Sequence, residues 1–363
     1  MQDSAHILQQ QVQQARTEKQ ALVISGGQSK NFYGYPIVGE QLNTTIHTGI
    51  IDYEPTELVL RARAGTPLKT IEKALLEHQQ VLACEPPHFS DNATLGGMVA
   101  AGLSGPSRPY RASIQDTVLG ATILNGKGEI LSFGGKVMKN VAGYDVSRLM
   151  VASLGCLGLI LDITLKVIPA TPAETSYVFT VESNKSVALI NDMRKQGLPV
   201  TGTCQFQGEL IVRFSAGVKE ISIIKDMLNK HYSFIEWKKL EEQEFWSNLR
   251  EQKSKFFDQN NSLWRLSVPA DANIEAVTKQ TGNLLTEWGG CLHWLKTDMQ
   301  PADIFTHMEK VNGQATLFRS ANMPSPENIF QPLTPSLAQW HKRLKESFDP
   351  DGILNPGKMY AQF

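Results

Sequence analysis

The fold is decided by the stretch Ala93-Thr94-Leu95-Gly96-Gly97-Met98-Val99-Ala100-Ala101-Gly102-Leu103-Ser104-Gly105, which consists largely of small residues. Small side chains fill a hydrophobic core poorly, and glycine destabilises a fold wherever its backbone freedom is unused. In series, small residues let the main chain lie flat against a large planar or phosphorylated ligand. The stretch therefore predicts either such a ligand site or a tightly packed, turn-rich segment.

A second glycine-rich loop, Ser25-Gly26-Gly27-Gln28-Ser29, follows a short apolar run at Ala21–Ile24 that is typical of a strand. Glycines in this position let successive backbone N–H groups point at phosphate oxygens and form an anion nest. Ser29 and Asn31 would add side-chain donors. Taken alone, the same loop also fits a plain turn.

Hydrophobic periodicity predicts the elements around these loops. Apolar residues at helical spacing predict a helix over Ala5–Ala15 and another with a buried face of Leu68, Ile71 and Leu75. Strict alternation over Glu57–Ala64 predicts a half-buried strand. Two apolar runs between Thr117 and Phe133 flank Asn-Gly-Lys-Gly at positions 125–128, a pattern that predicts a hairpin.

Glycine becomes rarer near residue 170, and the chain beyond it is more charged and more regularly periodic. Between Ser176 and Trp237 the pattern predicts strand, helix (186–196), strand, strand, helix (219–230) and strand. This β-α-β-β-α-β order is that of a ferredoxin-like unit. A last helix is predicted near 337–348, and no internal sequence repeat is visible. The sequence thus predicts an α+β fold with a domain boundary near residue 170.

Charge and hydropathy exclude several classes of protein. Thirty-five basic and 36 acidic residues leave a formal net charge of −1. No global field therefore favours nucleic acid or an anionic membrane surface. The longest apolar stretch, Leu149 to Leu161, is shorter than the roughly 20 residues of a membrane-spanning helix. The polar start lacks the apolar run of a secretory signal, so we expect a soluble, cytoplasmic protein.

The cysteines and histidines are scattered. The four cysteines form no C-x-x-C motif, and the eight histidines form no H-x-H or H-x-x-x-H motif. Zinc and iron–sulfur sites in proteins usually depend on such spacing. We therefore expect reduced cysteines and no metal site.

Together, three segments resemble the FAD-binding domain of the p-cresol methylhydroxylase/vanillyl-alcohol oxidase superfamily. They are the loop at Ser25–Ser29, the stretch at Ala93–Pro106 and the segment Ala152-Ser153-Leu154-Gly155-Cys156-Leu157-Gly158. Within the superfamily, Glu85-Pro86-Pro87 and Phe133–Leu149 are similar to the FAD-binding E subunits of bacterial glycolate oxidase (glycolate dehydrogenase). The resemblance runs from about residue 24 to 168 and returns at 348–359.

The resemblance implies the domain organisation and the cofactor. Residues 1–170 would form a p-cresol methylhydroxylase-type FAD-binding domain, residues 171–335 a ferredoxin-like antiparallel cap, and residues 336–363 a helix and tail returning to the FAD domain. Within the first domain, residues 25–30 match the pyrophosphate loop. Residues 94–101 with 104–105 match the stretch beside the flavin ring and the diphosphate, and residues 153–158 with the strand after them match the segment near the adenosine half. The cofactor-binding residues so implied are Ser25, Gly26, Gly27, Gln28, Ser29, Lys30, Pro86, Thr94, Leu95, Gly96, Gly97, Ala100, Ser104, Gly105, Ser153, Gly155, Gly158 and Ile160.

Three departures from the family pattern matter. Many relatives attach flavin covalently through a histidine directly after the Gly-Gly pair, but here Gln28 stands there, which predicts non-covalent FAD. Ala152 and Cys156 replace the usual glycine and threonine of the third segment, and a hydroxyl donor is lost at Cys156. The cap shows no paired histidines with a base, the constellation of relatives that oxidise 2-hydroxy acids.

No residue is assigned a catalytic role. Arginine would be the natural clamp for a substrate carboxylate, because its fork pairs both oxygens. A histidine could serve as the base. The candidate clamps are Arg111, Arg213, Arg265 and Arg319, and the candidate bases are His88 and His293.

The resemblance implies an FAD-binding subunit of a glycolate dehydrogenase complex that oxidises glycolate, and also D-lactate, to the oxo acid. Its partners would be a larger FAD-containing catalytic subunit and an iron–sulfur subunit, through which it would lie peripherally at the inner membrane. Three alternatives remain open: a non-catalytic FAD-containing accessory subunit, a flavin-free scaffold and a self-contained oxidase that uses oxygen.

Overall fold

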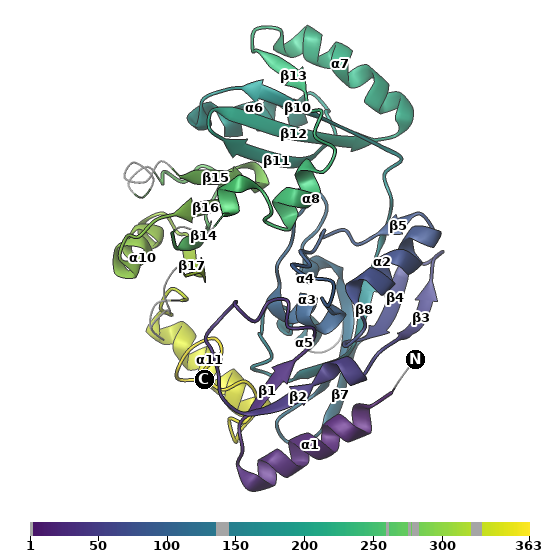
Figure 1. Ribbon diagram of the computed structural model, residues 1–363, viewed down its shortest axis with the longest axis vertical. Helices are drawn as coiled ribbons and strands as arrows, with labels where there is room; N and C mark the ends of the chain where they lie inside the picture. Colours follow the sequence, from purple (N-terminus) through teal and green to yellow (C-terminus); the bar gives the residue numbers. More distant parts are fainter. Residues whose placement is uncertain (1–2, 136–144, 259–260, 275–276, 278–282, 321–328) are drawn as a thin grey trace. The chain divides into compact units, whose positions relative to one another are not determined.

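The computed structural model describes residues 3–135, 145–258, 261–274, 277, 283–320 and 329–363 (Figure 1). The chain forms two compact units. The first comprises Met1–Ser104, Ala112–Ala170 and Pro332–Phe363, and the second comprises Gly105–Arg111 and Thr171–Gln331. The short excursion of 105–111 into the second unit lies inside the stretch that the sequence assigns to the FAD domain.

The first unit is built on a five-stranded antiparallel sheet with strand order β3-β4-β8-β6-β7. Its strands are β3 (Ile50–Glu54), β4 (Val59–Arg63), β8 (Leu159–Lys166), β6 (Val118–Leu124) and β7 (Ile130–Gly134). Two small sheets accompany it: β1 (Leu22–Ser25) pairs in parallel with β2 (Glu40–Asn43), and β5 (Gln80–Val81) pairs with β9 (Ile168–Pro169). The helices are α1 (Ala5–Glu18), η1 (Thr44–Ile46), α2 (Leu68–Glu77), α3 (Leu95–Ala101), α4 (Ile114–Thr117), α5 (Val146–Leu149) and α11 (Pro335–Phe348).

Hydrophobic burial explains these elements. Leu60 and Ala62 of β4 are fully buried while the alternate residues are half-exposed, so the predicted half-buried strand is confirmed. The helix face of Leu68, Ile71 and Leu75 is also fully buried, against the same sheet as α3. The predicted hairpin is confirmed by the antiparallel pairing of β6 with β7. One core of this unit therefore lies between the sheet and the helices α2 and α3, and a second joins α1 and β1 to Ile353 and Leu354 near the C-terminus.

A buried lysine anchors the C-terminal segment in the first unit. The Nζ atom of Lys345 donates to the carbonyl oxygens of Cys156 and Leu354, at 2.8 and 2.7 Å, and to Asp349 Oδ2 at 2.7 Å. Asp349 in turn accepts the backbone N–H groups of Ile353 and Leu354. All three ammonium donors are thus used inside the protein, which is the condition under which a buried ion pair is tolerated.

The second unit is one eight-stranded sheet with strand order β13-β10-β12-β11-β15-β16-β14-β17. Its first half follows the predicted ferredoxin-like order: β10 (Ala173–Thr180), α6 (Ser183–Lys195), β11 (Val200–Phe206), β12 (Glu209–Ala216), α7 (Val218–Tyr232) and β13 (Trp237–Lys239). After α8 (Phe245–Arg250) and η2 (Lys255–Phe257) come β14 (Leu263–Ser267), β15 (Leu284–Glu287), η3 (Trp288–Gly290), β16 (Leu292–Lys296), α10 (Pro301–Lys310) and β17 (Gln314–Arg319). The four strands of this second half are arranged in the sheet as those of the first, a structural duplication that the sequence does not reveal.

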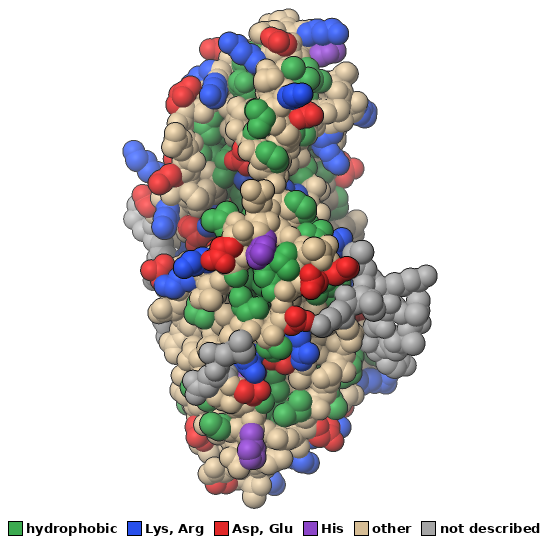
Figure 2. Space-filling model, turned by 90° about the vertical axis from the view of Figure 1, so that its right-hand side faces the viewer, with side chains coloured by type: hydrophobic (Ala, Val, Ile, Leu, Met, Phe, Trp, Pro, Cys, Tyr) green, Lys and Arg blue, Asp and Glu red, His purple; other side chains and the backbone are tan. Residues whose placement is uncertain are grey.

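Charged groups of both signs are interspersed on the face of the molecule seen in Figure 2. No helix among the described residues is long and apolar enough to cross a membrane.

Candidate functional site

A large cavity of the first unit, with a volume of about 1180 Å³, lies beside the loop that follows β1. Its volume suits an extended organic cofactor. The residues that line it are Val23, Ile24, Ser25, Gly26, Gly27, Gln28, Asn31, Pro36, Ile37, Gln41, Asn43, Thr45, Thr48, Gly65, Pro67, Lys69, Asp91, Asn92, Thr94, Asn355 and Lys358.

Close packing between two loops explains the first glycine pair. A Cβ atom on Gly27 would lie 1.4 Å from the carbonyl oxygen of Asn92, and one on Gly26 would lie 2.6 Å from Thr94 Oγ1. Either side chain would force the loops apart. Gln28 follows with φ of 57°, in the left-handed region that non-glycine residues rarely adopt. The loop is therefore held in a special conformation by the protein itself, and it borders the cavity in that conformation.

The glycines of α3 differ from each other in their surroundings. A Cβ atom on Gly96 would lie 2.8 Å from the Cβ atom of Ala64, so this glycine is required by packing in the core. Among the described residues, a Cβ atom on Gly97 would meet only Thr94 Oγ1 within 4 Å, at 3.2 Å. Gly97 and Ala100 are both half-buried, whereas Gly96 is buried. The partly open side of α3 is thus the side that carries Gly97 and Ala100.

The third segment, which the sequence assigns to the adenosine half, is made of packing residues. Ser153 Oγ donates to the carbonyl oxygen of Met150, and a Cβ atom on Gly155 would lie 2.6 Å from Asn355 Nδ2. Ala152 stands where relatives have glycine, and its φ is 62°. That backbone conformation explains the family's preference for glycine, since a side chain there costs about 1–2 kcal/mol.

Asn355 joins three parts of this site. Its Oδ1 accepts the backbone N–H of Ile24 at 2.7 Å, and its Nδ2 donates to the carbonyl oxygen of Leu154 at 2.7 Å. It also lines the cavity. The match of Asn355-Pro356 to a returning tail is the sequence signal for this position, but the hydrogen bonds could not be inferred from it.

Two lysines that the sequence does not predict as binding residues also line the cavity. Lys69 on α2 is exposed, and Lys358 lies near the C-terminal end with its pKa lowered by burial. Because the two lysines outnumber the one carboxylate of the described lining, that of Asp91, the lining has a net positive charge. Lysines attract phosphate groups as point charges. The loop N–H groups, the amide and hydroxyl side chains and these lysines therefore fit a diphosphate-containing cofactor such as FAD.

The structure brings together only some of the residues that the resemblance assigns to FAD. Ser25, Gly26, Gly27, Gln28 and Thr94 line the cavity. The others are outside its lining: Ser29, Lys30, Pro86, Leu95, Gly96, Gly97, Ala100, Ser104, Gly105, Ser153, Gly155, Gly158 and Ile160. Their contact with FAD stays a prediction, and part of the matched segment 133–149, residues 136–144, lies outside the described residues.

Ser104 and Gly105 fall in different units. Ser104 Oγ accepts the backbone N–H of Ile114 in the first unit, at 3.3 Å. The carbonyl oxygen of Gly105 accepts from Trp288 Nε1 in the second unit, at 3.0 Å. Lys30 Nζ donates to the carbonyl oxygen of His88 and lies over the ring of Phe89. These contacts give each residue a structural role whether or not FAD is bound.

The four candidate clamps all lie in the second unit and have partners there. Arg111 donates to Thr171 Oγ1, and Arg265 lies over the ring of Trp288. Arg213 is buried, donates to Thr201 and lies over the ring of Trp246. Arg319 donates to Gln252 and lies over the ring of Phe318. None of the four is among the described residues that line the two large cavities.

The two candidate bases are in different units. His88 Nε2 lies 3.0 Å from Glu72 Oε1 at the surface of the first unit. His293 is buried in the second unit, where its Nδ1 lies 2.8 Å from Thr286 Oγ1. Burial lowers the pKa of His293 to about 4. A proton acceptor with so low a pKa is a weak general base near neutral pH.

We expect the buried His293 to make stability depend on pH. Its pKa is lower in the folded than in the unfolded protein, so between about pH 6.5 and 4 only the unfolded chain takes up the proton. Stability is therefore full above pH 6.5 and falls with pH, by on the order of 3 kcal/mol. Urea unfolding at several pH values measures this effect. The dependence of the free energy of unfolding on pH should become weaker in His293→Gln and stay the same in His231→Gln. An unchanged pH dependence in His293→Gln would contradict this prediction.

The cysteines and the possible metal ligands of the described residues form no further chemical site. Cys84, Cys156 and Cys204 are buried free thiols, and burial raises the pKa of Cys156 to about 11. Among the described residues, no three His, Cys, Asp or Glu side chains are placed to hold a metal ion.

Comparison with known proteins agrees with the geometry. Residues 3–134 match the family described as FAD binding domain, and residues 331–359 match FAD linked oxidases, C-terminal domain. The chain is 42% identical over 360 residues to glycolate oxidase subunit GlcE of Escherichia coli (strain K12), a match that covers 99% of this chain and 98% of that protein. It is 23% identical to glycolate oxidase subunit GlcD of Bacillus subtilis (strain 168), over 74% of this chain and 68% of that protein.

A solved structure supports the fold. The structure of an alkyldihydroxyacetonephosphate synthase matches with a TM-score of 0.67 over 98% of this chain and 75% of that one, at 16% sequence identity. A likeness at this identity shows the fold alone. The near full-length match to GlcE and the two family matches show more: the chain belongs to the glycolate oxidase subunit GlcE family, among the FAD-linked oxidases with a p-cresol methylhydroxylase-type FAD-binding domain.

Proposed function

We propose that the chain is the FAD-binding subunit of a complex that oxidises short 2-hydroxy acids, glycolate first and D-lactate also, to the oxo acid. One observation carries the proposal: in a GlcE-family chain, the loop Ser25–Gln28 and Thr94 border a single large cavity whose lining is net positive. A diphosphate-containing cofactor needs N–H donors and positive charge together.

In this proposal, the residues of the chain hold and orient the cofactor. Bound FAD would supply the acceptor for the two electrons that leave the C–OH group of the substrate. The N–H groups of the loop at 26–28 would hold the diphosphate, with Lys69 and Lys358 offsetting its charge. Asn355 accepts the N–H of Ile24 in β1, directly before the loop, so it would act on the cofactor as a positioning residue.

We further propose that the chain works beside a larger FAD-containing subunit and an iron–sulfur subunit, which would pass electrons to the membrane. Both relatives, GlcE and GlcD, are subunits of glycolate oxidase, which supports assembly into a complex. Peripheral association with the inner membrane would follow from these partners.

One observation favours the accessory alternative, in which the larger subunit is the catalyst. The four candidate arginine clamps have protein contacts in the second unit, and the candidate base His293 has a low pKa caused by burial. A substrate would have to displace such contacts in order to bind. This chain would then hold a flavin without reducing it by glycolate.

Anaerobic addition of glycolate to the purified, FAD-loaded chain separates these functions. We expect the visible flavin bands to bleach if the chain is catalytic. Bands that persist with glycolate alone and bleach once the larger subunit is added would favour the accessory function. Bands that persist even in the assembled complex would contradict both.

The flavin should be non-covalent, because Gln28 stands at the position of the attaching histidine. Acid precipitation of the protein is therefore expected to leave all yellow colour in the supernatant. Gln28→His, which restores the histidine, is the matched variant for covalent attachment. Colour retained in the wild-type pellet would contradict the prediction.

A further inference from the structure

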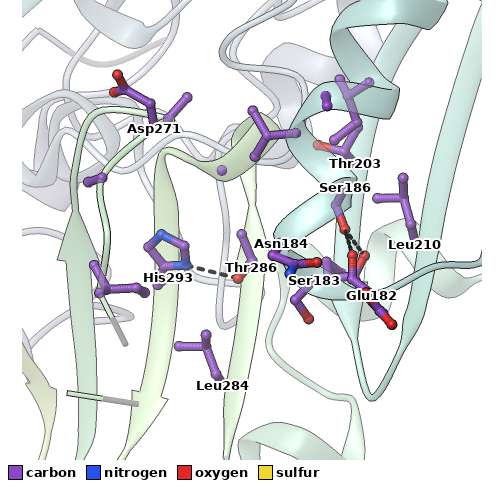
Figure 3. A pocket seen from close by; sticks show the side chains of 18 of the residues that line it. Glu182, Ser183, Asn184, Ser186, Thr203, Leu210, Asp271, Leu284, Thr286 and His293 are labelled. Carbon is purple, nitrogen blue, oxygen red and sulfur yellow. Dashed lines mark hydrogen bonds between the residues drawn. The ribbon is translucent and has the colours of Figure 1, made fainter. Parts of the chain in front are cut away.

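A second cavity, of about 880 Å³, lies within the second unit and shares no lining residue with the first (Figure 3). Helix α6 and strand β11 of the first half of the sheet line one side. The loop at 270–274 and strands β15 and β16 of the second half line the other. The volume is typical of sites for small organic ligands.

The cavity lies over the joint between the duplicated halves. Strands β11 and β15 pair at only two positions, Cys204↔Glu287 and Gln205↔Thr286. Gln205 and Thr286 are directly opposite each other, so their side chains are on the same face of the sheet, and both line the cavity. Each is hydrogen-bonded within its own half: Gln205 Oε1 accepts from Ser186 Oγ at 2.5 Å, and Thr286 Oγ1 lies 2.8 Å from His293 Nδ1.

Among the described residues that line this cavity, the charged side chains are carboxylates. Of the described residues that line this cavity, none is Lys or Arg, whereas Glu182 and Asp271 carry carboxylates. His293 adds no positive charge at neutral pH, because burial lowers its pKa to about 4. Glu182 pairs with Lys185 at 2.9 Å, but both side chains are about two-thirds exposed, and such pairs contribute little. The described part of the lining therefore favours a cation over glycolate, phosphate or the FAD diphosphate.

The start of α6 does not reverse this conclusion. A helix N-terminus attracts negative charge, but Glu182, at the N-cap position of α6, already supplies a carboxylate there. The other described residues of the lining are aliphatic or neutral. Val187, Ile190 and Leu284 offer apolar walls, and Asn191 and Asn273 add polar amide side chains to the lining. Such walls suit a hydrocarbon stem that ends in a charged group.

We propose that this cavity binds an aliphatic cation, an ammonium or guanidinium group on a hydrocarbon stem. Two sources share this chemistry: a free alkyl amine, or a lysine or arginine side chain of a partner subunit. Because the ligand would contact both halves at once, it would brace the narrow joint between β11 and β15. The site is separate from the flavin function and does not depend on it.

Calorimetric titration of the full chain tests the site with hexylamine as the cation and hexanol as its uncharged counterpart. We expect hexylamine to bind about 10-fold more tightly, a preference of the size that one favourable charge interaction gives. The double variant Glu182→Gln/Asp271→Asn should lose that preference. Glu241→Gln/Glu242→Gln, which changes two exposed carboxylates outside the cavity, should keep it.

A blocking variant locates the binding. Ala188 lines the cavity from an exposed position on α6, so Ala188→Trp should leave the fold intact and abolish binding of both probes. Equal affinity for hexylamine and hexanol in the wild type would overturn the proposal. So would a preference that survives in the double variant, or glycolate binding that Ala188→Trp abolishes.

Assembly with the larger flavoprotein subunit distinguishes the two sources of the cation. If a partner side chain fills the cavity, the double variant should assemble about 10-fold more weakly and hexylamine should compete with the partner. If a free amine fills it, assembly should be unchanged and hexylamine should still bind to the assembled complex. The flavin content reports on the other unit, so its loss would mark failure of the proposed function and not of this site.

Discussion

Gly97→Leu should abolish FAD retention while the protein remains folded. Among the described residues, the new Cβ atom would meet only Thr94 Oγ1 within 4 Å, at 3.2 Å, so a shift of a few tenths of an ångström in that hydroxyl makes room for it. Leucine is also a better helix former than glycine, by up to about 1 kcal/mol. If the flavin lies against the open side of α3, the leucine occupies its place and FAD affinity should fall about 100-fold. The flavin-to-protein absorbance ratio and the circular dichroism spectrum measure the two effects.

Two other glycines act as controls for this variant. A Cβ atom on Gly135 would meet no described residue within 4 Å, so Gly135→Leu should keep both the fold and the flavin. Gly96→Leu should damage the fold, because its Cβ atom would lie 2.8 Å from that of Ala64. A folded Gly97→Leu protein with full flavin content would show that the cofactor does not lie along α3.

Lys345→Met should lower the free energy of unfolding by about 3–5 kcal/mol, the usual effect of removing one partner from a buried ion pair. The side chains of Lys345 and Asp349 are 8% and 0% exposed. Without the ammonium group, Asp349 is left as a buried charge and the carbonyl oxygens of Cys156 and Leu354 lose their donor. Urea denaturation followed by circular dichroism measures the change.

Lys342→Met is the matched control on the same helix. Lys342 lies 4.0 Å from Glu346, and both side chains are more than half exposed. Its replacement should change stability by less than about 1 kcal/mol. Equal effects of the two variants would contradict the anchoring role of Lys345.

Much of the fold could be predicted because its signals are local. The alternation in β4, the helix face of α2 and the turn residues between β6 and β7 each act within a few residues, and each prediction was confirmed. The ferredoxin-like order of the first half of the second unit was also predicted. The duplication was missed because the two halves share a strand arrangement without sharing a visible sequence repeat.

The site could be predicted only in part because its contacts are distant in sequence. In the sequence, the two glycine pairs cannot be told apart: Gly26-Gly27 and Gly96-Gly97. Their roles separate only when Asn92, Thr94 and Ala64 are seen beside them. Asn355 bonds to Ile24 across 331 positions, and Lys358 comes from the same distant tail. Such pairings depend on how the chain closes on itself, which no local pattern encodes.

The central claim is that the cavity beside Ser25–Gln28 and Thr94 holds FAD. A crystal structure of the chain grown with FAD tests it most directly. We expect electron density for the diphosphate within hydrogen-bond distance of the backbone N–H groups at Gly26–Gln28, and for the flavin ring along Gly97. Density for FAD elsewhere, with only solvent in this cavity, would contradict the claim.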